Sequence, residues 1–130
     1  MNLREATMIT VPSFILRRLY VNKSLRKTKS GFEFQLNNKL GSGYARKLLP
    51  LTLDDVELPL EQCRFTVNGQ QVSFKDVSVE NPFTLAMNKK TVIAVNGVNL
   101  SGGNHKIGMT FEVAGLGILK FDFNDVAADD

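Results

Sequence analysis

The closing segment of the chain carries the pattern that most constrains its fold. From Lys106 to Phe123, apolar residues alternate with other residues on both sides of a turn at Gly115–Gly117. Alternation of this kind gives each strand one apolar face, and glycine permits the tight reversal between the two strands. The segment therefore predicts a β-hairpin with one buried face. The residues expected to face inward are Ile107, Met109, Phe111, Val113, Leu119, Phe121 and Phe123.

Shorter segments with the same alternation, separated by turn residues, fill the rest of the sequence. Asn68 and Gly69 join two of them and are a strong hairpin signal, because both residues tolerate positive φ. Pro50 is expected to interrupt another segment, because proline has no N–H to donate to a neighbouring strand. The strands expected before the closing hairpin are Phe14–Val21, Phe32–Leu36, Tyr44–Leu53, Cys63–Val67, Gln71–Phe74 and Thr91–Val95.

Seven to nine short antiparallel strands predict an all-β sandwich of immunoglobulin or fibronectin type, with a jelly roll as the alternative. The sequence has no Trp and a single Cys, so it lacks the disulfide and tryptophan that cross the sheets of antibody domains. Phenylalanine is expected to fill the space between the sheets instead. The predicted core residues are Phe32, Phe34, Phe65, Phe74, Phe111, Phe121 and Phe123.

A chain of 130 residues is expected to form one domain. Residues 1–13 are predicted to be an N-terminal arm, residues 14–124 the sandwich, and residues 125–130 an acidic tail. No stretch has the composition of a signal peptide, and no apolar run approaches the roughly 18 residues of a membrane span. We therefore expect a cytoplasmic protein without a membrane partner.

Positive charge is concentrated near the start of the chain. No acidic residue lies between Glu5 and Glu33, whereas six basic residues do: Arg17, Arg18, Lys23, Arg26, Lys27 and Lys29. A run of this kind is typical of a solvated edge and loop, of a surface that docks on an acidic partner, or of a nucleic-acid site. Nucleic-acid modules usually add aromatic stacking platforms, and only Tyr20 lies within this run. We therefore predict no nucleic-acid partner.

The residues that could carry chemistry are few. His105, the single histidine, is interpreted as a hydrogen-bonded residue at a strand end, with a site completed by another subunit as the alternative. Cys63 is interpreted as a buried free thiol. The acidic run Asp54–Glu57 is interpreted as a solvated turn, because it lacks the ligand spacing of a calcium loop. The sequence predicts no catalytic residue, no metal ligand and no cofactor in this chain.

The order of motifs between Val11 and Asp125 resembles a known family. These motifs are Val11–Thr28, Gly31–Asn38, Asn81–Pro82, Val95–Gly97, Leu100–His105 and Phe121–Asp125. The pattern is similar to short bacterial and archaeal proteins that are loosely labelled hydroxymethylglutaryl-CoA reductase. It also resembles the small β subunit of C-glycoside deglycosidases.

The resemblance implies a β-sandwich that assembles with a larger α subunit, a barrel similar to sugar-phosphate and xylose isomerases. In that family the α subunit binds a divalent metal and carries the chemistry. The complex cleaves the carbon–carbon bond between a 3-oxo sugar and an aromatic aglycone. The resemblance therefore implies that this chain is a non-catalytic, site-shaping member of a hetero-oligomer.

Three regions are expected to face such a partner: the basic segment from Arg17 to Lys29 and the loops Gly41–Tyr44 and Gly102–His105. Two other hypotheses stay open, a free-standing binding or interaction module and an independent hydrolase centred on Cys63 or His105. The candidate interface residues are Arg17, Arg18, Tyr20, Lys23, Tyr44 and His105.

Overall fold

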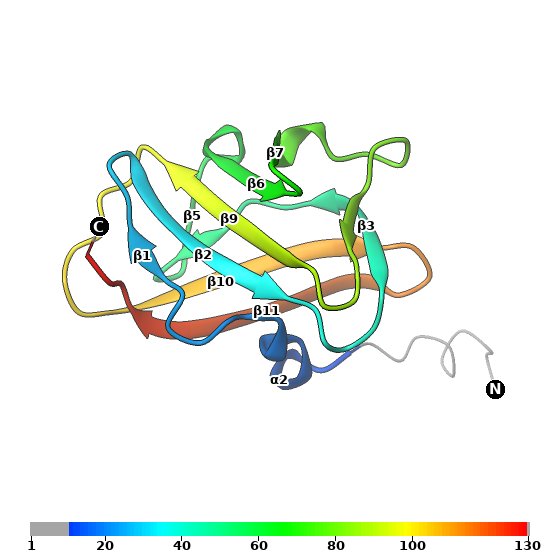
Figure 1. Cartoon of the computed structure of the whole chain (residues 1–130), viewed down its shortest axis with the longest axis horizontal. Coiled ribbons are helices and arrows are strands. Elements are labelled where there is room, and N and C mark those ends of the chain that lie inside the picture. Colours follow the sequence, from blue (N-terminus) through cyan, green and yellow to red (C-terminus); the bar gives the residue numbers. More distant parts are fainter. Residues whose placement is uncertain (1–10, 130) are drawn as a thin grey trace.

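Two antiparallel sheets pack face to face in the computed structural model, which describes residues 11–129 (Figure 1). The predicted all-β sandwich is confirmed. Three strands, β1, β4 and β5, are only two residues long, so the described chain contains eleven strands rather than the seven to nine expected. No helix in the described part of the chain is long and apolar enough to cross a membrane.

The first sheet has the strand order β1-β2-β9-β6-β7. Its strands are β1 (Arg26–Lys27), β2 (Gly31–Asn37), β9 (Lys90–Asn96), β6 (Cys63–Val67) and β7 (Gln70–Ser73). The second sheet has the order β5-β4-β10-β3-β8, and β11 pairs with the other side of β10. Its strands are β5 (Val56–Glu57), β4 (Thr52–Leu53), β10 (Asn104–Val113), β3 (Gly43–Leu48), β8 (Phe83–Leu85) and β11 (Gly117–Val126). Two 3₁₀ turns, η2 (Leu60–Gln62) and η3 (Phe74–Asp76), flank the β6–β7 hairpin.

Phenylalanine fills much of the space between the sheets, as predicted, together with leucine. All seven expected core phenylalanines are buried, and Phe83 joins them. The Phe34 and Phe123 rings meet edge to face across the sandwich with centroids 5.0 Å apart. The Phe65 and Phe83 rings pack in the same way at 4.7 Å. Burial of each such ring contributes roughly 1.5–3 kcal/mol to the stability of the fold.

The closing hairpin is confirmed. Strands β10 and β11 pair in unbroken register from Asn104 opposite Val126 to Val113 opposite Gly117. Strand β11 continues through Asp125 and Val126, two residues beyond the predicted end of the sandwich. His105 lies opposite Asp125 in this ladder, so the start of β10 and the end of β11 share one end of the molecule.

The predicted strand over Phe14–Val21 is wrong. This segment forms a short helix, α2 (Ser13–Leu16), followed by a 3₁₀ turn, η1 (Arg17–Leu19). Pro12 precedes the helix, and its carbonyl accepts the N–H of Ile15 at 3.0 Å. Leu16 and Leu19 are both buried, because a spacing of three places them on one helical face. Of the predicted arm over residues 1–13, residues 1–10 lie outside the described part.

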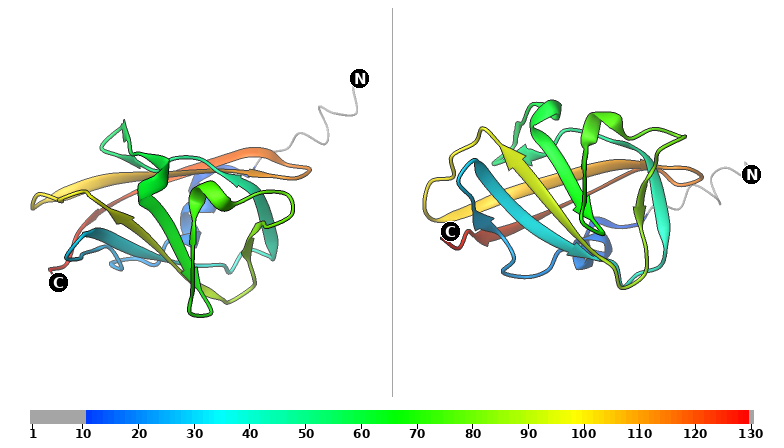
Figure 2. Two further views of the ribbon diagram at one scale, coloured as in Figure 1. Left: turned by 90° about the horizontal axis from the view of Figure 1, so that it is seen from above. Right: turned by 45° about the horizontal axis from the view of Figure 1, so that its top comes forward.

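The segment after α2 closes one side of the sandwich. Helix α2 packs against β11 and lies beneath it in the tilted view of Figure 2. Tyr20 then bridges to Leu36 of β2, and Arg26 forms a parallel bridge with Ala128. The predicted break at Pro50 is confirmed, since β3 ends at Leu48 and β4 begins at Thr52.

Candidate functional site

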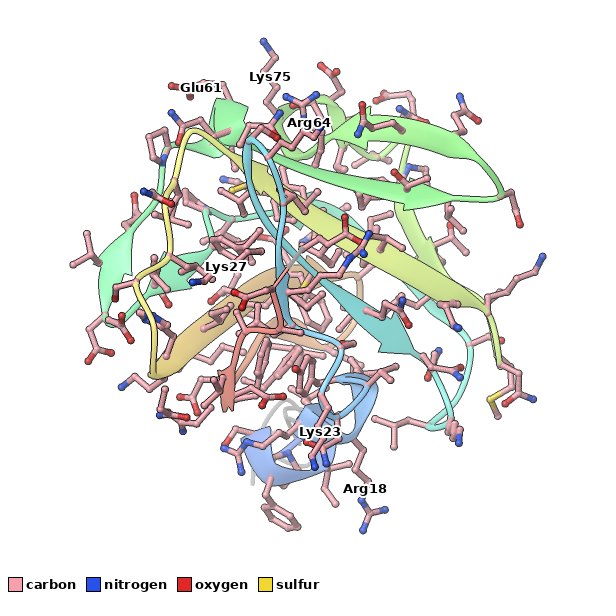
Figure 3. The ribbon with its side chains drawn as sticks, turned by 60° about the vertical axis from the view of Figure 1, so that its left-hand side comes forward. Arg18, Lys23, Lys27, Glu61, Arg64 and Lys75 are labelled. Atoms are coloured by element: carbon pink, nitrogen blue, oxygen red, sulfur yellow. The ribbon has the colours of Figure 1, made fainter. Side chains whose placement is uncertain are left out.

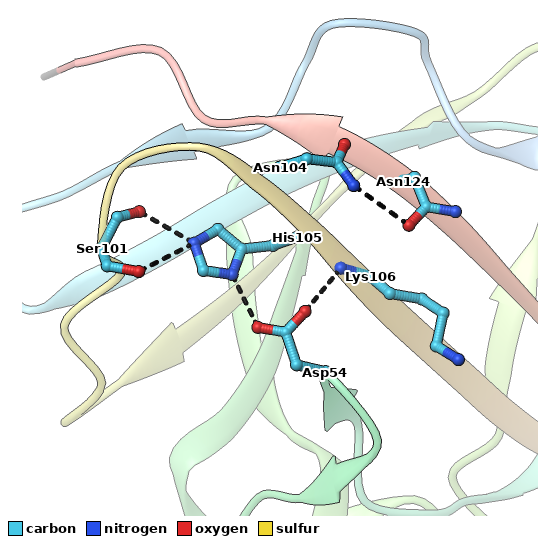
Figure 4. Close-up of polar contacts among 6 residues, drawn as sticks. All are labelled: Asp54, Ser101, Asn104, His105, Lys106 and Asn124. Atoms are coloured by element: carbon cyan, nitrogen blue, oxygen red, sulfur yellow. Dashed lines mark hydrogen bonds and ion pairs between the residues drawn. The ribbon is translucent and has the colours of Figure 1, made fainter.

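His105 is buried and stands at the centre of a cluster of hydrogen bonds with exposed residues (Figure 4). Its Nδ1 lies 2.7 Å from Oδ2 of Asp54, and its Nε2 lies 2.8 Å from the backbone carbonyl oxygen of Ser101. The other carboxylate oxygen of Asp54 accepts the N–H of Lys106 at 2.8 Å. The predicted interpretation of His105 as a hydrogen-bonded residue at a strand end therefore agrees with its contacts.

Both ring nitrogens of His105 face hydrogen-bond acceptors, so the protonated imidazolium form satisfies both. The Asp54 carboxylate, and then the Ser101 carbonyl, raise the pKa of His105 above its usual 6.5, against the effect of burial. The Lys106 N–H, and then His105, lower the pKa of Asp54. The pair is thus a charge-assisted contact that joins the β4–β5 turn to the start of β10.

Ser101, His105 and Asp54 contact one another in the order of a serine–histidine–aspartate triad. Oγ of Ser101 lies 3.4 Å from Nε2 of His105, which is at the limit of hydrogen-bond distance. A general base needs a free lone pair on Nε2, whereas the Ser101 carbonyl oxygen, 2.8 Å away, can only accept a hydrogen bond and so favours a proton on this nitrogen. The arrangement therefore clamps the loop at Ser101 onto β10 and leaves no nitrogen free to activate a nucleophile.

Asp54 and Asp55 form the two-residue turn between β4 and β5. Both have positive φ, 51° and 69°, as a type I′ hairpin requires. Asp55 pairs with Nζ of Lys106 at 2.7 Å. The turn is exposed, as predicted, but the Asp54 carboxylate is committed to His105 and β10. In the described residues no group of three or more His, Cys, Asp or Glu side chains is placed to hold a metal ion.

The side chain of Tyr20 forms its contacts within the chain. Its ring stacks on Phe123 with centroids 3.6 Å apart, and its hydroxyl donates to Asp125 at 2.7 Å. Asp125 also accepts the N–H of Lys23 at 2.9 Å. Burial and the hydrogen bond to Asp125 raise the pKa of Tyr20 to about 12. This contact fastens the first segment of the described chain to the last strand.

The cations of the segment from Arg17 to Lys29 do not form one uniform surface. Arg17 pairs with Asp122 at 3.5 Å, and Lys27 pairs with Asp129 at 3.7 Å. Arg26 pairs with Glu33 at 3.2 Å. Figure 3 shows the side chains of Arg18 and Lys23 near the helix and Lys27 farther along the molecule. Half of the run is therefore neutralised by acids of the same chain.

Cys63 is completely buried at the start of β6. Burial raises the pKa of its thiol, which keeps the sulfur protonated at neutral pH. Its Sγ lies 3.6 Å from the carbonyl oxygen of Pro59. Cys63 is thus a core residue, as the sequence predicted.

Tyr44 lies far from His105. It precedes Ala45, which pairs with Val113 at the far end of β10 from His105. Eight residues of extended strand correspond to about 26 Å. We call the region around Asp54, Ser101, His105 and Asp125 the polar end; in Figure 1 the loop before β10 marks it at the left.

Three turns lie at the opposite end, to the right in Figure 1, and they or the strands beside them carry exposed apolar side chains. We call this region the apolar end and define it by Leu40, Tyr44, Met87, Leu116 and Ile118, all of which are exposed. A pocket of about 230 Å³ opens here, and its lining is mainly apolar. Leu40 and Leu116 both line it, together with buried side chains from α2, β10 and β11. Sequence reasoning named Tyr44 and the loop Gly41–Tyr44 as candidates but missed Leu40, Met87, Leu116 and Ile118, although the leucines in two glycine-rich turns were a local signal.

One family is similar to most of the described chain. The family described as hydroxymethylglutaryl-CoA reductase, N-terminal domain, matches residues 15–128. The match runs from α2 to the end of β11 and so includes both ends of the sandwich. No curated protein matches the chain.

Proposed function

The chain belongs to the family of the hydroxymethylglutaryl-CoA reductase N-terminal domain, and we propose that it acts as the non-catalytic β subunit of a C-glycoside deglycosidase-like complex. In this proposal a larger isomerase-like barrel, the α subunit, binds the divalent metal and cleaves the carbon–carbon bond of a 3-oxo C-glycoside. The choice of this complex comes from the motif order between Val11 and Asp125.

The observation that carries the non-catalytic role is the state of His105. Both of its nitrogens are bonded to acceptors within the chain, and the imidazole is buried. Cys63, the other candidate nucleophile or base, is buried in the core with a raised pKa. The residues that could do chemistry therefore hold loops and strands together, which suits a scaffold that supports the site of another chain.

Co-purification with the barrel subunit tests the proposal. The chain is expressed together with an isomerase-like barrel protein of the proposed kind, and the mixture is separated by size exclusion with light scattering. We expect a complex containing both chains, and release of the aglycone from a 3-oxo C-glycoside only when both are present. Separate elution of the two chains, or full activity of the barrel alone, would contradict the proposal.

The competing interpretation follows the description of the family. If the isolated chain reduced hydroxymethylglutaryl-CoA, it would be an enzyme in its own right and the accessory role would be wrong. The His105→Ala variant also distinguishes an accessory subunit from an enzyme. We expect this change to alter the stability of the chain, whereas a catalytic histidine would alter the turnover of a folded enzyme.

A further inference from the structure

We infer that the apolar end is the surface through which this chain binds its partner subunit, and that the partner presents an apolar side chain flanked by Asp or Glu residues. This inference rests on the proposed accessory role and identifies the face that it uses. It selects one of the three regions expected to form the interface, the loop Gly41–Tyr44, and adds the β10–β11 turn.

The apolar side chains at this end are held on ordered turns. The buried side chain of Asn38 accepts the N–H of Leu40 at 3.0 Å and donates to the carbonyl oxygen of Leu85 at 2.8 Å. On the next turn, the N–H of Leu116 donates to the carbonyl oxygen of Val113 at 3.0 Å. Side chains presented on fixed turns lose little conformational entropy on binding. Their exposure is therefore suited to association.

The turn between β8 and β9, which carries Met87, is hydrogen-bonded to the turn that carries Leu40. The N–H of Asn88 donates to the carbonyl oxygen of Asn38 at 2.7 Å, and the N–H of Met87 donates to Oγ of Ser42 at 3.2 Å. These bonds keep Met87 beside the loop that carries Leu40. Contiguous exposed apolar side chains with polar surroundings are typical of protein interaction sites.

The pocket at this end has the size of an anchor site. Its volume of about 230 Å³ lies below the roughly 300–1,000 Å³ of typical small-molecule sites. Apolar side chains of one partner commonly fill such hollows at the centre of an interface, where they contribute most of the binding energy. The pocket is thus matched to a protruding side chain of a protein.

The charges around the apolar end are mainly positive, although Glu112 of β10 lies opposite Ile118. Residues 38–48, 83–91 and 113–121 contain no Asp or Glu. They contribute Lys39, Lys47, Lys89, Lys90 and Lys120, none of which forms an ion pair within the described chain. Arg46 is already paired with Glu112. A partner with acidic residues around its apolar anchor would complement this rim and associate faster because of it.

The test compares Leu116→Asp at the apolar end with Val56→Asp near the polar end, where the replaced side chain is also apolar and is more exposed. Affinity for the isomerase-like barrel subunit is measured by calorimetry. We expect Leu116→Asp to weaken binding by at least about tenfold, whereas Val56→Asp changes it by less than about twofold. The double change Lys39→Glu with Lys89→Glu should slow association by about tenfold, without altering the melting temperature.

Each contrary result has a separate meaning. If the unmodified chain does not bind the barrel, the proposed function and this inference both fail. If the chain binds and the two aspartate variants bind equally well, the function stands and the assigned face is wrong. The face is also wrong if Leu116→Asp abolishes self-association, or binding to phosphatidylglycerol vesicles, while barrel binding is unchanged. Equal destabilisation by Met8→Asp and Leu116→Asp would instead place residues 1–10 of this chain in the pocket, which also overturns it.

Discussion

The polar end and the apolar end differ in how they use the same kinds of residue. Tyr20 is stacked and hydrogen-bonded toward the polar end, whereas Tyr44 at the apolar end is 54% exposed. His105 is buried with both nitrogens bonded, whereas Leu116 is 43% exposed on a turn. Polar side chains at the polar end form hydrogen bonds within the chain, whereas apolar side chains at the apolar end are exposed to solvent. The difference separates residues that stabilise the chain from residues that are available to a partner.

The two tyrosines provide the largest contrast. Tyr20→Ala removes a stacked ring and the hydrogen bond to Asp125, so we expect a loss of about 3 kcal/mol in the free energy of unfolding. Tyr44→Ala should change it by no more than about 0.5 kcal/mol, because this ring faces solvent. Urea unfolding followed by circular dichroism measures both. Equal losses for the two variants would remove the distinction between the ends.

The second contrast lies within the polar end, between His105 and Ser101. His105→Ala leaves the Asp54 carboxylate and the Ser101 carbonyl without their partner, and we expect a loss of about 2 kcal/mol in the free energy of unfolding. Ser101→Ala retains the backbone carbonyl and should cost less than about 0.5 kcal/mol. Urea unfolding of both variants checks this. A large loss for Ser101→Ala would mean that its hydroxyl is the more important contact.

The His105 contribution should depend on pH. The fold raises the pKa of His105 above its usual 6.5, so the protonated form is favoured in the folded state. The stabilisation is therefore complete below pH 6.5 and declines as the pH rises through the raised value. We expect the difference in unfolding free energy between the native chain and His105→Ala to be larger at pH 6 than at pH 9. A difference that grows with pH would show that the neutral ring is the stabilising form.

The smallest expected effect is on the stability of the apolar end itself. Leu116→Asp replaces an exposed side chain, so the free energy of unfolding should change by no more than about 0.5 kcal/mol. Differential scanning calorimetry of the isolated chain provides the measurement. A marked loss of stability would show that Leu116 is already packed against this chain and is not available to a partner.

Local patterns predicted the sheets well. The hairpin of β10 and β11 was predictable because alternation over Ile107, Met109 and Phe111 is long enough to exclude a helix. The segment at Phe14 was too short for that distinction. Its leucines at positions 16 and 19 share one face of a helix but would lie on opposite faces of a strand, and Pro12 precedes the helix.

Contacts between distant residues were not predictable. Asp54 reaches His105 because β4 pairs with β10 in one register, and Tyr20 reaches Asp125 across 105 positions of sequence. Neither register follows from alternation alone. The opposite charges of the segment from Arg17 to Lys29 and of the last strand were a usable signal for the second contact. The acidic tail therefore contributes to the fold through Asp125 and Asp129.

Hydrogen–deuterium exchange of the chain with and without the barrel α subunit tests the central claim most directly. The account predicts slower exchange in residues 38–44 and 113–118 on mixing, with residues 52–57 and 101–106 unchanged. Protection of residues 52–57 and 101–106, with residues 38–44 and 113–118 unaffected, would contradict it by making the polar end the interface.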